Sequence, residues 1–226
     1  MTPTLYKYDN TKEYALDAAS AIEDFIAFKL EGKESVKIAL SGGQSPIPVY
    51  KALIKNGRVE WDKVELFMVD ERYVPPQSDE SNFRMLENEI LSKINLLKFF
   101  HGFHTEQPME EAAAEYNILL SDMKQPLFDL VLLGFGKDGH TASLFPKSPA
   151  LKESKKLAVH TQAPDKSYRL TLTCPAILSS EKIMFLIQGK DKEELVEKWA
   201  AEDASAAALP ATRILEHENV EVYYSY

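Results

Sequence analysis

Cysteine and long apolar runs are nearly or wholly missing from this sequence. Its 226 residues include one cysteine, Cys174, so no internal disulfide can form, and a chain without disulfides is typical of a reducing compartment. No segment approaches the roughly 18 consecutive apolar residues that a bilayer-spanning helix needs, and the N-terminus has no signal-peptide pattern. We therefore expect a cytoplasmic protein that does not cross a membrane.

Positive charge is also scarce. The chain has 26 Lys and Arg against 35 Asp and Glu, a formal net charge of -9. Such a charge disfavours general binding to nucleic acid or to an anionic membrane surface, although a few cations gathered in one pocket can still bind a small anion. The histidines have no zinc-ligand spacing, and no G-x-S-x-G sequence surrounds Ser143. The sequence therefore predicts neither a metal site nor a serine nucleophile.

What is present describes an ordinary globular domain. Hydrophobic residues make up 45% and charged residues 27%, and 226 residues suffice for a stable core. The patterns predict strands at 4–8, 36–40, 64–69, 130–133, 157–161, 168–173, 183–188 and 220–224, and helices at 11–29, 46–55, 82–94, 109–123 and 191–201. Because strands and helices alternate, we expect an α/β fold in one domain over 1–226. Its main part would be a mostly parallel, Rossmann-like doubly wound sheet with helices on both faces, plus a small additional β-containing lobe.

The most informative stretch is FDLVLLGFGKDGHTASLFP at 128–146. Its apolar start predicts a buried strand, and Asp138-Gly139-His140 follows where that strand ends. In open α/β sheets, ligands bind at the carboxyl ends of strands. His140 is a candidate general base, because an unperturbed imidazole titrates near pH 6.5, and Asp138 is placed to orient its ring. The alternative is a structural histidine that caps the loop.

A glycine turn, Ser41-Gly42-Gly43-Gln44-Ser45, joins a predicted strand to a predicted helix. Such a turn presents free N–H groups and the positive end of a helix dipole, which suits a phosphate. The spacing matches neither a Walker loop nor G-x-G-x-x-G. The pattern alone therefore leaves two interpretations open: the turn binds a phosphate, or it merely reverses the chain.

Charged residues on three other strands complete the candidate site. Asp70 and Arg72 follow one strand, Arg169 lies inside a second, and Lys190 follows a third. Arg72 can pair with an anion, and Asp70 can accept hydrogen bonds from hydroxyl groups or from a reacting water. An Arg inside an apolar strand is costly without an anionic partner. Asp70, Arg72 and Lys190 are also compatible with a solvated surface, but together with the glycine turn the cations predict a phosphate clamp.

Taken together, these stretches resemble the 6-phosphogluconolactonase family. The matching segments are ALSGGQSPIPVYKAL at 39–53, VELFMVDERYVPPQSDESNFRML at 64–86 and the stretch at 128–146, with Arg169, Lys190 and Leu209-Pro210-Ala211 in addition. They occur in the family's order over nearly the whole chain, which makes the resemblance specific. The nearest alternative is the glucosamine-6-phosphate deaminases of the same superfamily.

Two departures separate the chain from those deaminases. They typically continue His-Ile-Ala-Phe-Asn-Glu-Pro where this chain has HTASLFP at 140–146, and they have Asp-Glu-Tyr where this chain has Asp70-Glu71-Arg72. Lys137 is a smaller departure from the lactonase pattern, in which a Pro or Glu often precedes the Asp. It removes no catalytic group.

The resemblance implies hydrolysis of 6-phospho-D-glucono-1,5-lactone to 6-phosphogluconate in the pentose phosphate pathway. His140 would activate water and Asp138 would orient His140. Either Arg72 or backbone N–H groups near Gly136 would stabilise the oxyanion. The residues implied to bind substrate are Ser41, Gly42, Gly43, Gln44, Ser45, Asp70, Arg72, Arg169 and Lys190. A lactone is already electrophilic, so no metal or organic cofactor is implied.

Two other functions stay open on the sequence: an isomerising deaminase, and a non-catalytic phosphosugar-binding protein. A binding protein would need the phosphate clamp but not the pair formed by Asp138 and His140. The expected partner is a small-molecule phosphosugar lactone, with no nucleic acid and no membrane. We expect a monomer or a weak homo-oligomer.

Overall fold

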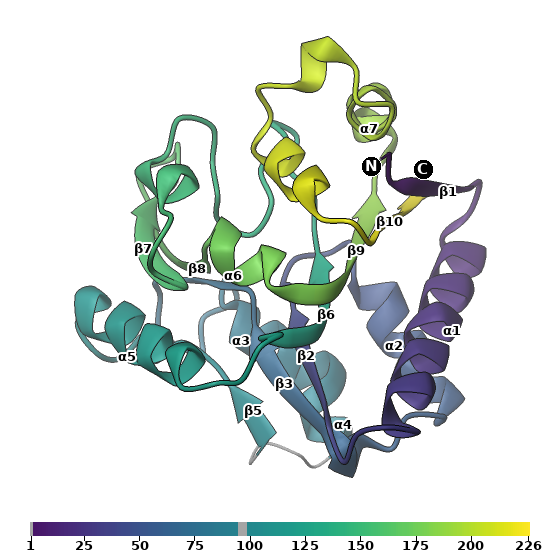
Figure 1. Cartoon of the computed structure of the whole chain (residues 1–226), viewed down its shortest axis with the longest axis horizontal. Helices are drawn as coiled ribbons and strands as arrows, with labels where there is room; N and C mark the ends of the chain where they lie inside the picture. Colours follow the sequence, from purple (N-terminus) through teal and green to yellow (C-terminus); the bar gives the residue numbers. More distant parts are fainter. Residues whose placement is uncertain (1, 95–98) are drawn as a thin grey trace.

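The computed structural model describes residues 2–94 and 99–226, and its strands form two sheets (Figure 1). The strands are β1 (Thr4–Tyr8), β2 (Val36–Leu40), β3 (Val64–Met68), β4 (Asp70–Arg72), β5 (Phe100–His101), β6 (Phe128–Leu133), β7 (Ala158–Gln162), β8 (Tyr168–Leu172), β9 (Ser180–Gln188) and β10 (Val220–Ser225). The large sheet has the order β1-β10-β9-β6-β2-β3-β5, and all its neighbouring strands are parallel. The small sheet is antiparallel, in the order β4-β8-β7.

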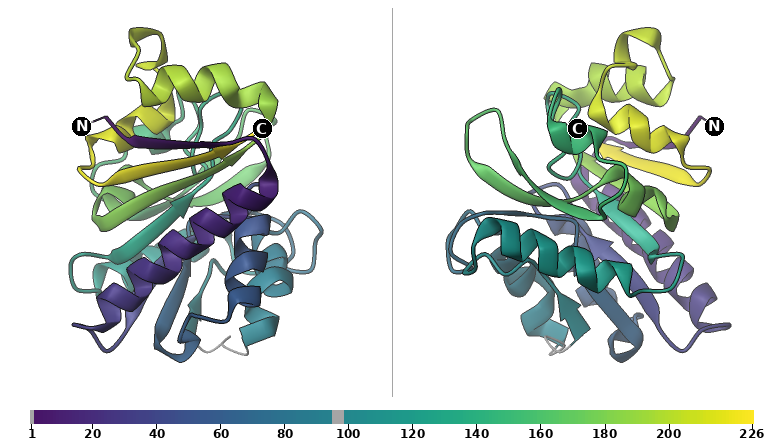
Figure 2. Two further views of the ribbon diagram at one scale, coloured as in Figure 1. Left: turned by 90° about the vertical axis from the view of Figure 1, so that its right-hand side faces the viewer. Right: turned by 60° about the vertical axis from the view of Figure 1, so that its left-hand side comes forward.

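Helices cover both faces of the large sheet (Figure 2). The helices are α1 (Thr11–Leu30), α2 (Ile47–Asn56), α3 (Asn82–Leu86), α4 (Ser92–Ile94), α5 (Met109–Ser121), α6 (Cys174–Leu178) and α7 (Glu193–Ala200), with a π-helical turn, η2 (Glu87–Leu91), between α3 and α4. α1 and α2 pack together on one face, while α5, α6 and the small sheet lie on the other (Figures 1 and 2). Parallel strands are buried on both sides by such an arrangement, which explains their nearly continuous apolar sequences.

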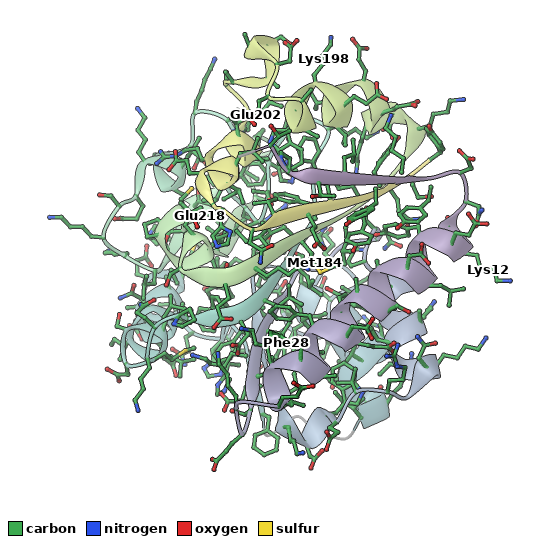
Figure 3. All side chains as sticks on the ribbon, turned by 45° about the vertical axis from the view of Figure 1, so that its right-hand side comes forward. Lys12, Phe28, Met184, Lys198, Glu202 and Glu218 are labelled. Atoms are coloured by element: carbon green, nitrogen blue, oxygen red, sulfur yellow. The ribbon has the colours of Figure 1, made fainter. Side chains whose placement is uncertain are left out.

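The longest helix, α1, shows how local sequence and packing agree. The Asn10 side chain caps it by accepting a hydrogen bond from the Glu13 N–H at 2.9 Å. Tyr14, Ala18 and Ile22 recur every four residues and are at most 1% exposed, so they form the buried stripe. Figure 3 shows side chains filling the space between α1 and the strands, whereas the labelled Lys12 at the start of α1 projects away from them.

The centre of the large sheet is β6, and all six of its residues are buried. On one side of β2 the sheet continues through β3 and β5, and on the other side through β6, β9 and β10. The direction of chain progression therefore reverses between β2 and β6. Such a switch point leaves a crevice at the carboxyl ends of the strands, because the loops after the two strands turn to opposite faces.

The chain passes from the large sheet to the small one at Val69. The Val69 N–H donates to the carbonyl of Leu40 at the end of β2, at 3.0 Å, and the Val69 carbonyl accepts from the N–H of Leu172 in β8, at 2.8 Å. One residue thus joins both sheets. As a result, β4 and β8 stand beside the carboxyl ends of β2 and β6.

The predicted fold class is confirmed, because a mostly parallel sheet with helices on both faces carries a small β lobe. Details differ. Residues 70–72 form a strand of the small sheet, because Leu170 and its neighbours in β8 pair with them. The single helix expected at 82–94 is divided by the π-helical turn, and the helix expected from residue 191 starts at Glu193 after a 3-10 turn. The short helix α6 was not predicted.

Within the described part of the chain, no helix combines the length and the apolar character needed to cross a membrane.

Candidate functional site

Two adjoining cavities lie where the sheets meet, at the carboxyl ends of β2, β3 and β6. The first cavity has a volume of about 190 Å³ and includes the glycine turn after β2. The second has a volume of about 430 Å³ and includes residues 163–165 of the hairpin between β7 and β8. Asp70, Arg72, Asn82 and His140 line both cavities. The switch point of the sheet therefore holds one continuous site with two ends.

Most of the residues expected from the sequence meet here. The first cavity is lined by Ser41, Gly42, Gly43, Gln44, Ser45, Asp70, Arg72 and His140, and the second by Asp70, Arg72, Asp138, His140 and Arg169. Lys190 lines neither cavity and is exposed. Lys192, two residues later, lines the first.

The glycine turn is held from behind by two phenols. Tyr50 of α2 donates to the Ser41 carbonyl at 2.8 Å, and Tyr14 of α1 donates to the Ser45 carbonyl at 3.0 Å. Gly43 has a φ of +84°, which a side chain would disfavour, and the turn leads directly into α2. With its carbonyls bound on the protein side, the turn leaves N–H groups and the start of α2 for a ligand.

Ser41 adds a donor to this end of the site. Its hydroxyl oxygen is buried and has no hydrogen-bond partner among the described residues. A buried hydroxyl without a partner is costly, so a bound group would satisfy it. Gly42 is required by Asn82, because a Cβ at Gly42 would lie 2.1 Å from the Asn82 amide. The turn and Asn82 are thus packed against each other.

In Asp70-Glu71-Arg72, the middle residue has a structural role. The buried Glu71 carboxylate accepts hydrogen bonds from the N–H groups of Arg72, Asn82 and Phe83, each at 2.7 Å, and from the Ser81 hydroxyl at 2.9 Å. Burial raises the pKa of Glu71, and these donors oppose the rise. Glu71 therefore anchors the start of α3, and with it Asn82, to β4. Since side chains alternate along a strand, Asp70 and Arg72 both face the cavities.

Asp70 lies at the junction of the two cavities. It accepts a hydrogen bond from the Ser143 hydroxyl at 2.6 Å, and the Asn82 amide donates to its backbone carbonyl at 2.9 Å. Burial raises the pKa of Asp70, opposed by the Ser143 hydrogen bond and by the charges of His140, Arg72 and Arg169. Ser143 therefore serves as a hydrogen-bond donor to the Asp70 carboxylate.

His140 is oriented by Asp138. The Nδ1 atom of His140 lies 2.5 Å from Oδ1 of Asp138, which also accepts from the His140 N–H at 3.2 Å. Burial works against ionisation of Asp138, but the hydrogen bonds and charge of His140 outweigh it, and the pKa of Asp138 is lowered. An ionised Asp138 places the proton of a neutral imidazole on Nδ1, so Nε2 carries the lone pair. No hydrogen bond to Nε2 is found among the residues that the structure describes.

The backbone of the loop around His140 packs closely against the imidazole ring. The Gly136 N–H donates to the His140 carbonyl at 2.8 Å, and a Cβ at Gly136 would lie 2.2 Å from the His140 ring. Gly139 has a φ of +74° and packs against Leu209. The Phe145 ring also lies against the imidazole, with centroids 4.7 Å apart. Gly136 and Phe145 therefore both restrict the position of the ring.

Cations differ between the two ends of the site. Lys192 lines the first cavity, and its pKa is lowered, chiefly by burial. Arg169 lines the second, where its guanidinium donates to the Ser167 hydroxyl at 2.7 Å. Lys137, at the rim, forms an ion pair with Asp191 at 2.7 Å. In the described ranges 2–94 and 99–226, no group of three or more His, Cys, Asp or Glu side chains is arranged to hold a metal.

Comparison with known proteins shows the family of the chain. Residues 9–224 match the family model described as glucosamine-6-phosphate isomerases/6-phosphogluconolactonase. The chain belongs to this family. It is 33% identical over 226 residues to the 6-phosphogluconolactonase of Helicobacter pylori strain 26695, with 98% of this chain and 97% of that protein covered.

Solved structures of lactonases in the family have the same fold. The crystal structure of 6-phosphogluconolactonase from Thermotoga maritima superposes with a TM-score of 0.85 at 30% identity and covers 99% of each chain. A 6-phosphogluconolactonase from Trypanosoma brucei superposes with a TM-score of 0.87 at 28% identity, covering 99% of this chain and 96% of that one.

Lys192 and Asn82 are among the cavity residues that the sequence did not single out. Lys192 is separated from Lys190 by one residue, and nothing local distinguishes them. Gly189, with a φ of +119°, and the 3-10 turn after it decide which lysine reaches the cavity. Asn82 looked like an ordinary helix start after Ser81, and only its contact with Gly42 reveals its position. The available signals were that Asn82 lies in the segment at 64–86 that resembles the family, and that Lys192 ends the Gly-Lys-Asp-Lys run that begins with Gly189 and Lys190.

Proposed function

We propose that this protein hydrolyses 6-phospho-D-glucono-1,5-lactone to 6-phosphogluconate, a step of the oxidative pentose phosphate pathway. The observation that carries the proposal is the position of His140. Its ring lines both cavities, its Nδ1 is bound to Asp138, and its Nε2 is free to take a proton. A general base oriented in this way, beside an anion site, matches the chemistry of a phosphorylated lactone.

The first cavity is suited to the phosphate. It combines the N–H groups of the glycine turn, the unpartnered Ser41 hydroxyl and the ammonium group of Lys192. Phosphate oxygens accept from such donors, and the start of α2 adds a favourable dipole. Lys190 stays a sequence-based candidate, but its exposed position favours Lys192 in this role.

The proposed reaction needs one group that takes a proton from water and later returns it to the ring oxygen. His140 takes a proton from water at Nε2 while the water oxygen attacks C1 of the lactone. The tetrahedral oxyanion collapses, the bond between C1 and the ring oxygen breaks, and the protonated His140 returns its proton to that oxygen. The ionised Asp138 stabilises the imidazolium between these two transfers. General base catalysis of this kind contributes about 10²–10⁴-fold.

The two other functions are less well supported. Where the deaminases have Glu, this chain has Phe145, whose ring packs 4.7 Å from the imidazole and supplies no carboxylate. A non-catalytic binding protein has no need of a histidine oriented by an aspartate. Ammonia release from glucosamine 6-phosphate separates the deaminase from the lactonase.

The direct test is hydrolysis of freshly generated lactone, followed by acid release at neutral pH with an enzyme-free blank, since the lactone also hydrolyses spontaneously. We expect His140→Ala to lose about 10²–10⁴-fold in kcat. His160→Ala is the matched control, because His160 is exposed on β7 and lines neither cavity of the site. Full turnover by His140→Ala would exclude His140 as the base, and no rate above the blank in the wild type would exclude the reaction.

The remaining expectations from the sequence are kept as part of the proposal. We propose that residues 1–226 act as a single phosphosugar lactonase domain, which the pairing of β1 with β10 supports because it joins the two ends of the chain in one sheet. A cytoplasmic location and a monomeric or weakly associating state rest on the sequence alone.

A further inference from the structure

Two arginines stand opposite each other in the second cavity. Arg72 of β4 and Arg169 of β8 are direct cross-strand partners, and both line the cavity. Like charges placed directly opposite on antiparallel strands destabilise a sheet. Burial and the charge of Arg72 both lower the pKa of Arg169, so the folded protein holds this pair at a cost. A bound anion would stabilise two arginines in this arrangement.

Among the residues that the structure describes, the hydrogen-bond acceptors of the two arginines are neutral oxygens. Arg72 donates to the Glu80 carbonyl at 2.5 Å and to the Asn82 amide oxygen at 3.2 Å, which are neutral acceptors. Arg169 donates to the neutral oxygens of Ser167 and Tyr168, at 2.7 and 3.1 Å. The carboxylate paired with Arg169 is that of Asp165, which is exposed and 3.9 Å away.

Asp70 offsets the two positive charges only in part. Its carboxylate lines the same cavity, and the charges of both arginines act to lower its pKa. However, the carboxylate accepts its hydrogen bonds from Ser143 and Asn82 and not from the arginines. The two guanidinium groups therefore keep N–H donors for a ligand.

A phosphorylated lactone has one anionic group, and the site has two cationic ends. The glycine turn and Lys192 line the first cavity, Arg169 lines the second, and Arg72 and His140 line both. If the phosphate occupies the first end, the second end faces C1. Negative charge appears at C1 only during the reaction, first on the tetrahedral oxyanion and then on the carboxylate of the product.

We propose that the Arg72–Arg169 pair is the C1 subsite, which stabilises the oxyanion and binds the carboxylate of the product. This inference rests on the proposed lactonase function and assigns Arg169 to C1 instead of to the phosphate clamp. In this role the hydroxide derived from water adds to C1, and the carbonyl electrons move to the oxygen that faces the arginines. They return when the bond between C1 and the ring oxygen breaks.

The chemistry of the two ends favours this orientation over the reverse. Arginine presents a planar fork of donors that matches the two coplanar oxygens of a carboxylate. Backbone N–H groups at a helix start, with a lysine as a point charge, are typical of phosphate sites. In this orientation of the substrate, the His140 imidazole, which lines both cavities, lies beside C1.

The test compares two ligands that differ only at C1, by isothermal titration calorimetry. One is 6-phosphogluconate, and the other is D-glucitol 6-phosphate, which has CH₂OH in place of the carboxylate. We expect the wild type to prefer 6-phosphogluconate by about 10- to 100-fold, the effect of hydrogen bonds to a charged group. Arg169→Gln should lose most of this preference by weakening only 6-phosphogluconate, and Arg169→Lys, which keeps the charge without the fork, should fall between.

Two companion variants complete the design. Lys166→Asn removes a positive charge from the same hairpin, where Lys166 is exposed and has a φ of +70° that Asn tolerates, and it should leave both affinities within about twofold. Lys192→Gln should weaken both ligands by the same factor. Circular dichroism and thermal melting establish that each variant is folded. In turnover, Arg169→Gln should lower kcat more than it raises KM, which a merely structural role would not produce.

The outcomes separate this inference from the proposed function. An equal loss for both ligands in Arg169→Gln would show that Arg169 holds the phosphate, and no loss for either would show that the pair is no subsite. A wild type that hydrolyses the lactone without preferring 6-phosphogluconate would refute the C1 subsite and leave the lactonase function standing. A wild type that neither hydrolyses the lactone nor binds either ligand would refute the function itself.

Discussion

Gly136→Ala provides a sharp test of how tightly His140 must be placed. The new Cβ would lie 2.2 Å from the Cε1 and Nδ1 atoms of the ring. Ordinary contacts begin at 3.4 Å, so the ring must move by about 1.2 Å. Gly136 does not have a positive φ, so alanine fits its backbone, and the contact with the ring is the main perturbation.

That movement should be costly for catalysis. A shift of this size breaks the 2.5 Å contact between Nδ1 and Asp138 and moves Nε2 away from the attacking water. A displacement of about 1 Å in an active site costs on the order of 10²-fold in rate, and we expect a loss of this size in kcat. The assay is lactone hydrolysis with freshly prepared substrate and blank subtraction, and thermal melting checks the fold.

Gly32→Ala is the matched control for this substitution. It adds the same methyl group at a glycine that lines neither cavity, where no atom lies within 4 Å of the added Cβ. We expect its kcat to stay within about twofold of the wild type. If Gly136→Ala also stayed within that range, the imidazole would tolerate displacement, and the argument that the loop fixes the base would be wrong.

Two further predictions concern the charged groups of the site. Lys192→Gln should raise KM by about 10- to 100-fold, whereas Lys190→Gln should change it by no more than about twofold, and steady-state kinetics of the pair would contradict the assignment if Lys190→Gln had the larger effect. Asp70→Asn should stabilise the protein in a pH-dependent way. Because burial raises the pKa of Asp70 above 3.8, the folded state loses stability as the pH rises from 3.8 through that raised pKa, and Asn removes this loss. The gain in Tm should be near zero below pH 3.8 and reach a plateau at neutral pH, and a gain that is constant with pH would contradict the sign.

Three adjacent charged residues, Asp70, Glu71 and Arg72, have different roles in the site. Glu71 is buried and ties the start of α3 to β4, while Asp70 and Arg72 on either side of it face the cavities. Alternation along a strand sends neighbouring side chains to opposite faces. A short strand in the small sheet therefore supplies two ligand-facing groups and one structural group from three consecutive residues.

Much of the fold was predictable because it depends on periodicity. The apolar run of β6, the buried stripe of α1 and the alternation of strands and helices are local patterns, and β6 and α1 lie where their patterns place them. The part of the site carried by single loops was predictable for the same reason. Asp138 and His140 are two residues apart, so their contact needs only a glycine turn between them.

Other features depend on segments that are distant in the sequence. Residues 70–72 became a strand because β8, about one hundred residues later, pairs with them. Asn82 entered the site because Glu71 holds its backbone N–H and because Gly42 leaves room for its side chain. The sequence pattern within either segment does not predict these contacts.

The sequence by itself determined most elements of this protein, the likeness to its family and the candidate pair Asp138 and His140, because these follow from local patterns and from motif identity. The tertiary structure decided how the site residues are distributed between two ends of one site. Lys192 lines a cavity and Lys190 does not, and Arg169 faces Arg72 across two strands instead of joining the glycine turn. The physical reason is that strand pairing, which acts between distant segments, places Arg169 opposite Arg72, while the backbone conformation of the turn at Gly189 sets which lysine lines the cavity.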